Sequence, residues 1–196
     1  LDFILNSKEA HDRPKNVLDT IETQNVERIQ QNTFYISRPN WNKIKYYNYW
    51  KYPSSHGPKQ KKYIPLLTSR GCPYGCDFCV SPEITGRNWE ALSPENVVEQ
   101  IEYLKKEYGV NNFFVEDLNP TVQFERWDMI CDLLIKKKIN ISFFFVSGTK
   151  LETIKVDQLL KFSSAGCKYI SFSPESGSSE LMKIIGKKFD YSHGID

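Results

Sequence analysis

Residues 93–117 read SPENVVEQIEYLKKEYGVNNFFVED, and this stretch decides the fold class of the chain. Ser93 followed by Pro94 is a typical helix start, because serine caps the first turn and proline fits its backbone. Apolar residues then recur at helical spacing up to Gly109, where we expect the helix to end. The apolar run at residues 112–117 predicts a buried strand, so this stretch is one helix followed by one strand.

The same alternation continues on both sides of this stretch. Short apolar runs predict further strands at residues 64–68, 142–147 and 169–173, and apolar periodicity predicts helices at residues 127–138, 156–166 and 178–185. Apolar strands that alternate with amphipathic helices are typical of a parallel sheet covered by helices. We therefore predict an α/β fold of four β-α units. The pattern leaves open whether the sheet is doubly wound or forms part of a barrel.

Polar residues follow each of the four predicted strands. A cysteine-rich loop follows the first strand, Glu116 and Asp117 end the second, Ser147 and Gly148 end the third, and residues 174–178 (PESGS) follow the fourth. The carboxyl ends of parallel strands lie at the same edge of a sheet, and functional groups of α/β proteins gather there. We therefore expect the functional site at this edge.

The cysteine-rich loop holds Cys72, Cys76 and Cys79 in a C-x3-C-x2-C pattern. Three thiolates at this spacing can hold three corners of a cubane iron–sulfur cluster, and no fourth cysteine lies nearby to bind the remaining iron. An open coordination position is typical of a metal centre that performs chemistry. A zinc knuckle would need a fourth ligand, and so would an electron-carrying ferredoxin cluster. Glycine and proline around the thiols predict a loop, which disfavours inert buried cysteines.

Residues 68–79, TSRGCPYGCDFC, resemble the radical S-adenosylmethionine enzymes. The hallmark of that family is C-x3-C-x2-C with an aromatic residue, here Phe78, before the last cysteine. The resemblance covers residues 63–196 and implies a partial (βα) TIM-type barrel, with four of about six βα units present. It also implies a [4Fe–4S] cluster on Cys72, Cys76 and Cys79, with S-adenosylmethionine bound to the open iron.

The resemblance implies a reaction as well. One electron from the reduced cluster cleaves S-adenosylmethionine, and the resulting 5′-deoxyadenosyl radical abstracts hydrogen from a small-molecule or peptide substrate. The protein positions these groups and excludes water and oxygen, and a flavodoxin or ferredoxin is the expected electron donor. Phe78 and Ser147 are implied contacts of the cofactor. Glu116 and Asp117 are implied to lie near its methionine amino group, and Glu175 and Ser176 near its ribose or methionine part. Strand-end or helix-cap roles remain the alternative for these acidic and serine residues.

The segment from Asn40 to Tyr63 and the RNW run at residues 87–89 resemble the cobalamin-dependent branch of this family. That branch implies cobalamin bound through a domain not present in this chain, and a methylation, ring-forming step or rearrangement at an unreactive carbon. We predict an N-terminal segment and an irregular, aromatic-rich linker arm over residues 1–62. Residues 63–196 are then a core domain cut short at its C-terminal end. An unpaired last strand should leave residues 1–196 alone with poor cluster binding and little turnover.

Three alternatives remain open. A tRNA-modifying radical enzyme of the methylthio-transferring kind would need more cysteines before Cys72, and there are none. Residues 34–63 interleave aromatic residues with lysines, as RNA-binding surfaces do, although an arm packed on the barrel is the more common interpretation. The third alternative is an iron–sulfur carrier without catalysis.

Composition limits the partners of the chain. The net charge of +2 and the lack of an apolar run of roughly 20 residues favour neither nucleic acid nor a membrane. Clustered cysteines indicate a metal site in a reducing compartment, so a cytoplasmic location is expected. The two remaining cysteines, Cys131 and Cys167, are expected to be packed structural thiols.

Overall fold

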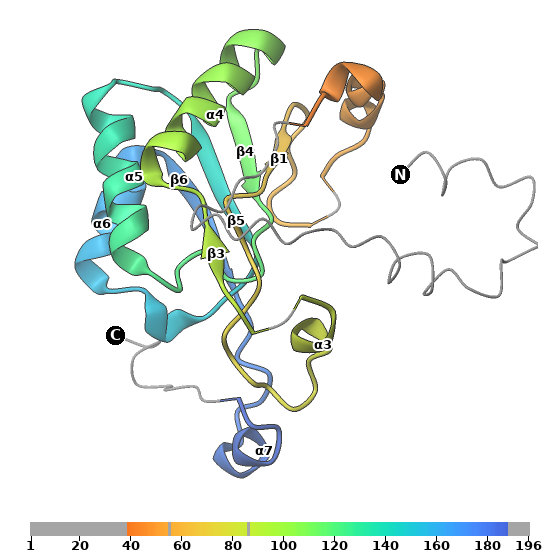
Figure 1. Cartoon of the computed structure of the whole chain (residues 1–196), viewed down its shortest axis with the longest axis vertical. Coiled ribbons are helices and arrows are strands. Elements are labelled where there is room, and N and C mark those ends of the chain that lie inside the picture. The colour runs from red at the N-terminus through yellow and green to blue at the C-terminus, as the bar shows by residue number, and fades with distance from the viewer. Residues whose placement is uncertain (1–38, 55, 86, 188–196) are drawn as a thin grey trace, which may run out of the picture. The chain divides into compact units, whose positions relative to one another are not determined.

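A parallel four-stranded sheet with three helices on one face forms the centre of the computed structural model, which describes residues 39–54, 56–85 and 87–187 (Figure 1). The strand order is β1 (Ile64–Leu66), β4 (Asn112–Val115), β5 (Ser142–Thr149) and β6 (Cys167–Phe172), and all three pairings are parallel. The helices are α4 (Pro94–Tyr108), α5 (Phe124–Lys136) and α6 (Val156–Ala165). Neighbouring strands follow one another along the chain with their helices on one side, as in a barrel. The predicted α/β class is therefore confirmed, and the arrangement is that of a partial (βα) barrel.

Each of the four strands differs from its predicted range by one or two residues at one or both ends. The strand predicted over residues 112–117 stops at Val115, and the one predicted over residues 169–173 runs from Cys167 to Phe172. The strand expected over residues 64–68 stops at Leu66, and a short β2 (Ser69–Arg70) then pairs antiparallel with β3 (Glu90–Ala91). The prediction that Ser147 ends its strand was wrong, because β5 continues to Thr149. The longer strand pairs with β6 through a register shift, which brings Thr149 opposite Phe172.

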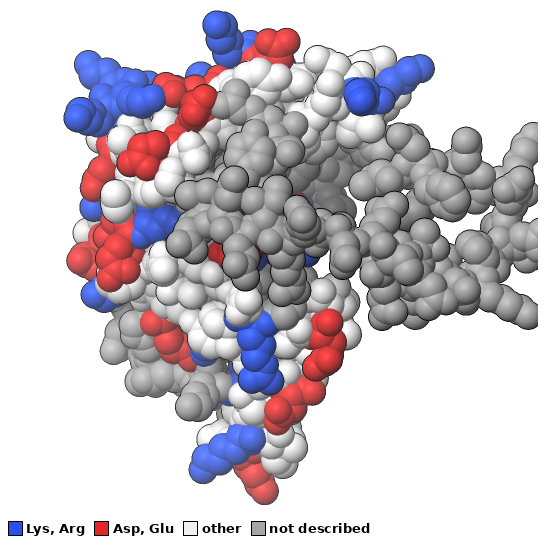
Figure 2. Space-filling view, viewed as in Figure 1, with Lys and Arg blue, Asp and Glu red and all other residues white. Residues whose placement is uncertain are grey.

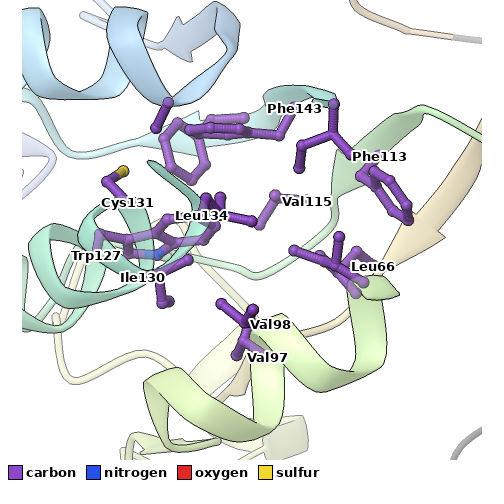
Figure 3. Packing of buried hydrophobic residues seen from close by; sticks show 14 of the residues in the cluster. Leu66, Val97, Val98, Phe113, Val115, Trp127, Ile130, Cys131, Leu134 and Phe143 are labelled. Atoms are coloured by element: carbon purple, nitrogen blue, oxygen red, sulfur yellow. The ribbon is translucent and has the colours of Figure 1, made fainter. Parts of the chain in front are cut away.

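The main core lies between the sheet and the helices (Figure 3). Side chains of β4 and β5 that point to this side meet Trp127 of α5, whose ring is 4.7 Å from that of Phe145 and 5.5 Å from that of Phe143. Val97 and Val98 of α4 approach from the other end of the cluster. The large buried rings make this face the main source of hydrophobic stabilisation.

The opposite face of the sheet, here called the inner face, carries a smaller cluster of Phe114, Phe144 and Val146. The chain before β1 covers it. The Tyr63 ring stacks on Phe114 at 4.7 Å, and the backbone at Gly57 lies against Val146. We call residues 56–63 the strap, because they cross the inner face from β5 to β1.

The aromatic-rich arm before the strap also packs on the domain, as expected. It forms two short 3-10 helices, η1 (Trp41–Lys43) and η2 (Tyr46–Lys51). Trp41, Tyr46 and Trp50 rest against the main core, and the indole nitrogen of Trp50 donates to the carbonyl oxygen of Tyr63 at 2.6 Å. The part of the predicted N-terminal segment before residue 39 lies outside the described residues. The predicted boundary at residue 62 stays a prediction.

Within the described ranges, β6 pairs on one side only. Tyr169 and Phe172 of this strand and Val156 and Leu160 of α6 are exposed. An unpaired strand beside an apolar helix face is the edge at which a further β-α unit of a barrel would pack. In the same ranges, no helix combines the length and apolarity needed to cross a membrane.

The close approach of the strap to the sheet leads to a first prediction. Gly57 has φ of +66°, and a Cβ added to it would lie 2.8 Å from Cγ1 of Val146. Gly57→Ala should therefore cost about 1–2 kcal/mol and loosen the strap, since alanine disfavours this backbone conformation. Limited trypsin digestion should then cut faster after the exposed Lys59.

Gly177→Ala is the matched control. An added Cβ there meets nothing within 4 Å, and its φ is not positive. Equal rates of cleavage after Lys59 in the two variants and the unchanged chain would show that Gly57 does not hold the strap in place.

Candidate functional site

The three clustered cysteines lie in one loop, residues 71–89, that β2 and β3 close at its base. Gly71 begins the loop with φ of +84°, and an added Cβ would lie 1.9 Å from the carbonyl oxygen of Asn88. Only glycine allows this crossing of the two backbone segments. The start of the loop is therefore tightly fixed.

Cys72, Cys76 and Cys79 are all free and partly exposed. The amide of Cys79 donates to the carbonyl oxygen of Cys76 at 3.0 Å, which makes a turn between the last two thiols. Burial raises the pKa of the Cys76 thiol, and charge on Cys72 and Cys79 raises it further. The three thiols thus lie close enough to influence one another electrostatically. Among the described residues, no group of three His, Cys, Asp or Glu side chains is arranged to bind one metal ion. This includes the three loop cysteines.

Two lysines lie close to the cysteine loop and give it a positive electrostatic environment. Lys187 and Lys150 both lower the pKa of Cys76, against the effect of burial. The Nζ atom of Lys150 also lies 5.2 Å from the ring centre of Tyr74. Three thiols with nearby cations fit an anionic iron–sulfur cluster, because thiolates are its protein ligands and the cations offset its charge.

The segments that follow β5 and β6 border the cysteine loop. Lys150, just after β5, lies over Tyr74 as described, and the amide of Asp77 donates to the carbonyl oxygen of Ile185 at 3.1 Å. Ile185 directly follows α7 (Ser179–Ile184), the helix after β6. The carboxyl edge of the sheet therefore brings together loops that are distant in sequence.

Glu175 and Ser176 lie in the turn between β6 and α7. Glu175 adopts φ of +64°, which is unusual for a residue with a side chain, and Lys187 holds it through a 2.7 Å ion pair with Oε1. Lys187 also donates to the carbonyl oxygen of Ser173 at 2.5 Å. The Ser176 hydroxyl accepts from the amide of Ser178, so it supports the start of α7 as a cap would.

Glu116 directly follows β4 and faces the inner side of the sheet. Both of its carboxylate oxygens lie 3.1 Å from Nε2 of His56 in the strap. The pair borders a cavity of about 240 Å³ whose walls include Trp41, Trp50 and Tyr63. Glu116 is partly exposed in this position, with 30% of its side-chain surface accessible.

Asp117 follows Glu116 but points to the opposite side and is fully buried. Its carboxylate accepts from the Thr68 amide at 2.6 Å, from the Thr68 hydroxyl at 2.5 Å and from the Ser69 hydroxyl at 2.6 Å. Burial raises the pKa of Asp117, and the hydrogen bonds from Ser69 and Thr68 act against this rise. The structure thus separates two acidic residues that the sequence places together.

The guanidinium of Arg126 is the positive charge nearest to this buried group. Its Nε atom donates to the carbonyl oxygen of Leu92 at 2.7 Å and its Nη2 atom to that of Thr68 at 2.8 Å. Burial lowers the pKa of Arg126 to about 10, while the charge of Asp117 raises it. Arg126 therefore stays positively charged at neutral pH.

The two remaining predicted residues lie apart from these contacts. Phe78 is 56% exposed at the surface of the cysteine loop, and Ser147 is half-buried within β5. Several residues that contact the site were not among the predicted site residues, because their partners are distant along the chain. These residues are His56, Thr68, Ser69, Arg126 and Lys187.

The fold and the loop together define a class of protein. It is an α/β protein of the partial-barrel kind, with a three-thiol cluster loop after the first strand at the carboxyl edge of its sheet. Comparison with known families names the class more closely. The family profile described as "Radical SAM superfamily" matches residues 66–193, and the chain belongs to that family.

Individual relatives agree with this assignment. The chain is 30% identical over 180 residues to an anaerobic magnesium-protoporphyrin IX monomethyl ester cyclase of Synechocystis. The matched region covers 91% of this chain and 33% of that protein. The fold of this chain is similar to that of the radical S-adenosylmethionine methyltransferase TsrM of Kitasatospora setae. That comparison gives a TM-score of 0.60 at 16% identity, over 68% of this chain and 27% of the other.

A second solved structure is similar over the same share of this chain. The cobalamin-dependent S-adenosylmethionine radical enzyme OxsB matches with a TM-score of 0.56 at 25% identity, over 68% of this chain and 21% of that one. The chain therefore spans between 21% and 33% of the length of these three relatives.

The surroundings of the five cysteines lead to a second prediction. Burial raises the pKa of Cys131 and raises that of Cys167 to about 11, so at pH 8 only roughly one part in a thousand of the Cys167 thiol is ionised. Cys131 is buried and should resist iodoacetamide in the native chain, whereas the three partly exposed loop thiols should react. Cys167 is also partly exposed and should react slowly, because so little of it is ionised.

Peptide mass spectrometry after timed alkylation measures this difference. In guanidinium chloride all five cysteines should react at similar rates, which controls for reagent access. Rapid native alkylation of Cys131 would contradict the packing described here.

Proposed function

We propose that this chain is the S-adenosylmethionine-cleaving core of a cobalamin-dependent radical enzyme. The observation that carries the proposal is the three-thiol loop held at the carboxyl edge of a partial (βα) barrel, in a chain of the radical S-adenosylmethionine family. When bound, the [4Fe–4S] cluster supplies an open iron for S-adenosylmethionine and the electron that cleaves it. The chain itself supplies ligands, positioning and charge.

Each site residue has a proposed role. Cys72, Cys76 and Cys79 hold three irons, and Phe78 beside them contacts the cofactor. Glu116 accepts a hydrogen bond from the methionine amino group of S-adenosylmethionine, since it is an accessible carboxylate on the inner face. Ser147, Glu175 and Ser176 contact the rest of that molecule, and Lys187 keeps Glu175 in its left-handed conformation.

The reaction we propose is a methylation or a ring-forming rearrangement at an unreactive carbon. The relatives support it, because their names describe a methyltransferase, a cyclase and a cobalamin-dependent enzyme. Cobalamin would bind through a part of the parent protein outside this chain. A small-molecule or peptide substrate, a flavodoxin or ferredoxin as electron donor, and a cytoplasmic location complete the proposal.

The surface and the arm favour this function over RNA binding. On the face shown in Figure 2, basic and acidic side chains are interspersed, so no basic stripe is visible there. Trp41 and Trp50 pack against the core, so these two rings are not free to stack on bases.

A third prediction tests the cluster. After anaerobic reconstitution, Cys76→Ala should lose most of the iron and sulfide that the unchanged chain binds, because only two thiolates remain in the loop. Cys167→Ser is the matched control, since it replaces a thiol outside the loop and should leave the iron content unchanged. Equal iron content in the Cys76→Ala and unchanged chains would rule out the proposed ligand set.

A fourth prediction concerns the contact between His56 and Glu116. If the amino group of S-adenosylmethionine binds Glu116, it must replace the imidazole of His56 there. His56→Ala should therefore tighten S-adenosylmethionine binding several-fold, and Glu116→Gln should weaken it, as measured by equilibrium dialysis with the reconstituted chain. Unchanged affinity in both variants would place the amino group elsewhere.

A further inference from the structure

The buried carboxylate of Asp117 has an unusual set of partners. It is fully buried, and its hydrogen-bond donors belong to the two consecutive residues Thr68 and Ser69. A buried charge is costly unless hydrogen bonds and a counter-charge compensate it. Here the donors and the nearby Arg126 provide that compensation.

These donors lie where the chain enters the cysteine loop. Only Arg70 and Gly71 separate Ser69 from Cys72. The carbonyl oxygen of Thr68 accepts from the amide of Leu92 at 2.9 Å, which ties this entry to the chain that leaves the loop after β3.

Arg126 binds both sides of the same junction. It donates to the carbonyl oxygens of Thr68 and Leu92, so one side chain of α5 spans the entry and the exit of the loop. Asp117 holds the entry from the end of β4. Four segments that are distant in sequence therefore meet at the base of the cysteine loop.

We propose that Asp117 and Arg126 are positioning residues of the cluster loop, which act through Thr68, Ser69 and Leu92 and touch neither the cluster nor S-adenosylmethionine. This inference rests on the proposed function, because it assigns the loop to a cluster. It gives Asp117 a different role from Glu116. Asp117 fixes the position of the chain just before Cys72, and Glu116 faces S-adenosylmethionine.

Asp117→Asn is the informative change because it keeps the shape of the side chain. An amide has one oxygen acceptor, whereas the carboxylate accepts from three donors. The asparagine oxygen can keep the bond from the Thr68 amide, which is made to Oδ1, but the hydroxyls of Thr68 and Ser69, which donate to Oδ2, must rotate to accept from the new NH2 group. The change also removes the negative charge that faces Arg126. The domain can thus fold while the entry to the loop shifts.

The first experiment uses the chain without a cluster, so it does not depend on the proposed function. Timed alkylation with iodoacetamide should modify Cys72 at least about threefold faster in Asp117→Asn than in the unchanged chain, because the loop opens more often. The buried Cys131 reports folding in the same sample and should stay protected. Glu102→Gln, a change at an accessible carboxylate that pairs with Lys137, is the control and should not alter either rate.

Arg126→Lys gives a second test of the geometry. Lysine keeps the charge but has no planar fork to reach two carbonyl oxygens at once. We expect Arg126→Lys to accelerate Cys72 alkylation as Asp117→Asn does. If Cys131 also becomes reactive in Asp117→Asn, that variant has lost its fold. Ser69→Ala, which removes only the hydroxyl donor of Ser69 to Asp117, then takes its place in the comparison.

The second experiment uses the reconstituted chain. Electron paramagnetic resonance of the reduced cluster should change when S-adenosylmethionine is added to the unchanged chain, and this change should be reduced in Asp117→Asn. Unaltered Cys72 alkylation in both variants, with Cys131 protected, overturns the positioning role. An unchanged chain that takes up no iron overturns the proposed function instead, while the alkylation result still decides the role of Asp117.

Discussion

The parallel pairing of β1, β4 and β5 is the constraint on which the rest of the structure depends. These strands pair residue for residue, from Ile64 opposite Phe113 to Val115 opposite Phe145. Because side chains alternate along a strand, this register sorts every residue of β4 and β5 to one of two faces. One face packs on the helices, and the other packs on the strap.

The same alternation explains the different positions of Glu116 and Asp117. Phe113 and Val115 face the helices, and Phe114 faces the strap. The alternation continues past the end of β4, so Glu116 lies on the inner face beside His56, and Asp117 lies on the helix side beside Thr68. Two adjacent carboxylates thus have different solvent exposure, different partners and different chemistry.

Much of the fold was predictable, because strong local signals agree with it. Ser93 and Gly109 bound α4 as predicted, since capping and a left-handed glycine are local effects. The end of β5 was not predictable, because it depends on a register shift against β6. The cysteine loop was visible as a motif, but its supports were not. The contacts from Arg126 to Thr68 and from Lys187 to Glu175 depend on the tertiary structure alone.

The division between the two faces also explains how a partly open sheet can hold a well-defined site. The loop is anchored on the helix side, where Asp117 and Arg126 are buried. The face offered to a ligand is covered by the strap, whose Tyr63 end stacks on the buried Phe114 and whose His56 end is partly exposed. Strongly buried contacts resist local opening and weakly buried ones do not. A ligand at Glu116 therefore meets the partly exposed end of the strap at His56, on the other side of the sheet from the contacts that hold the base of the cysteine loop.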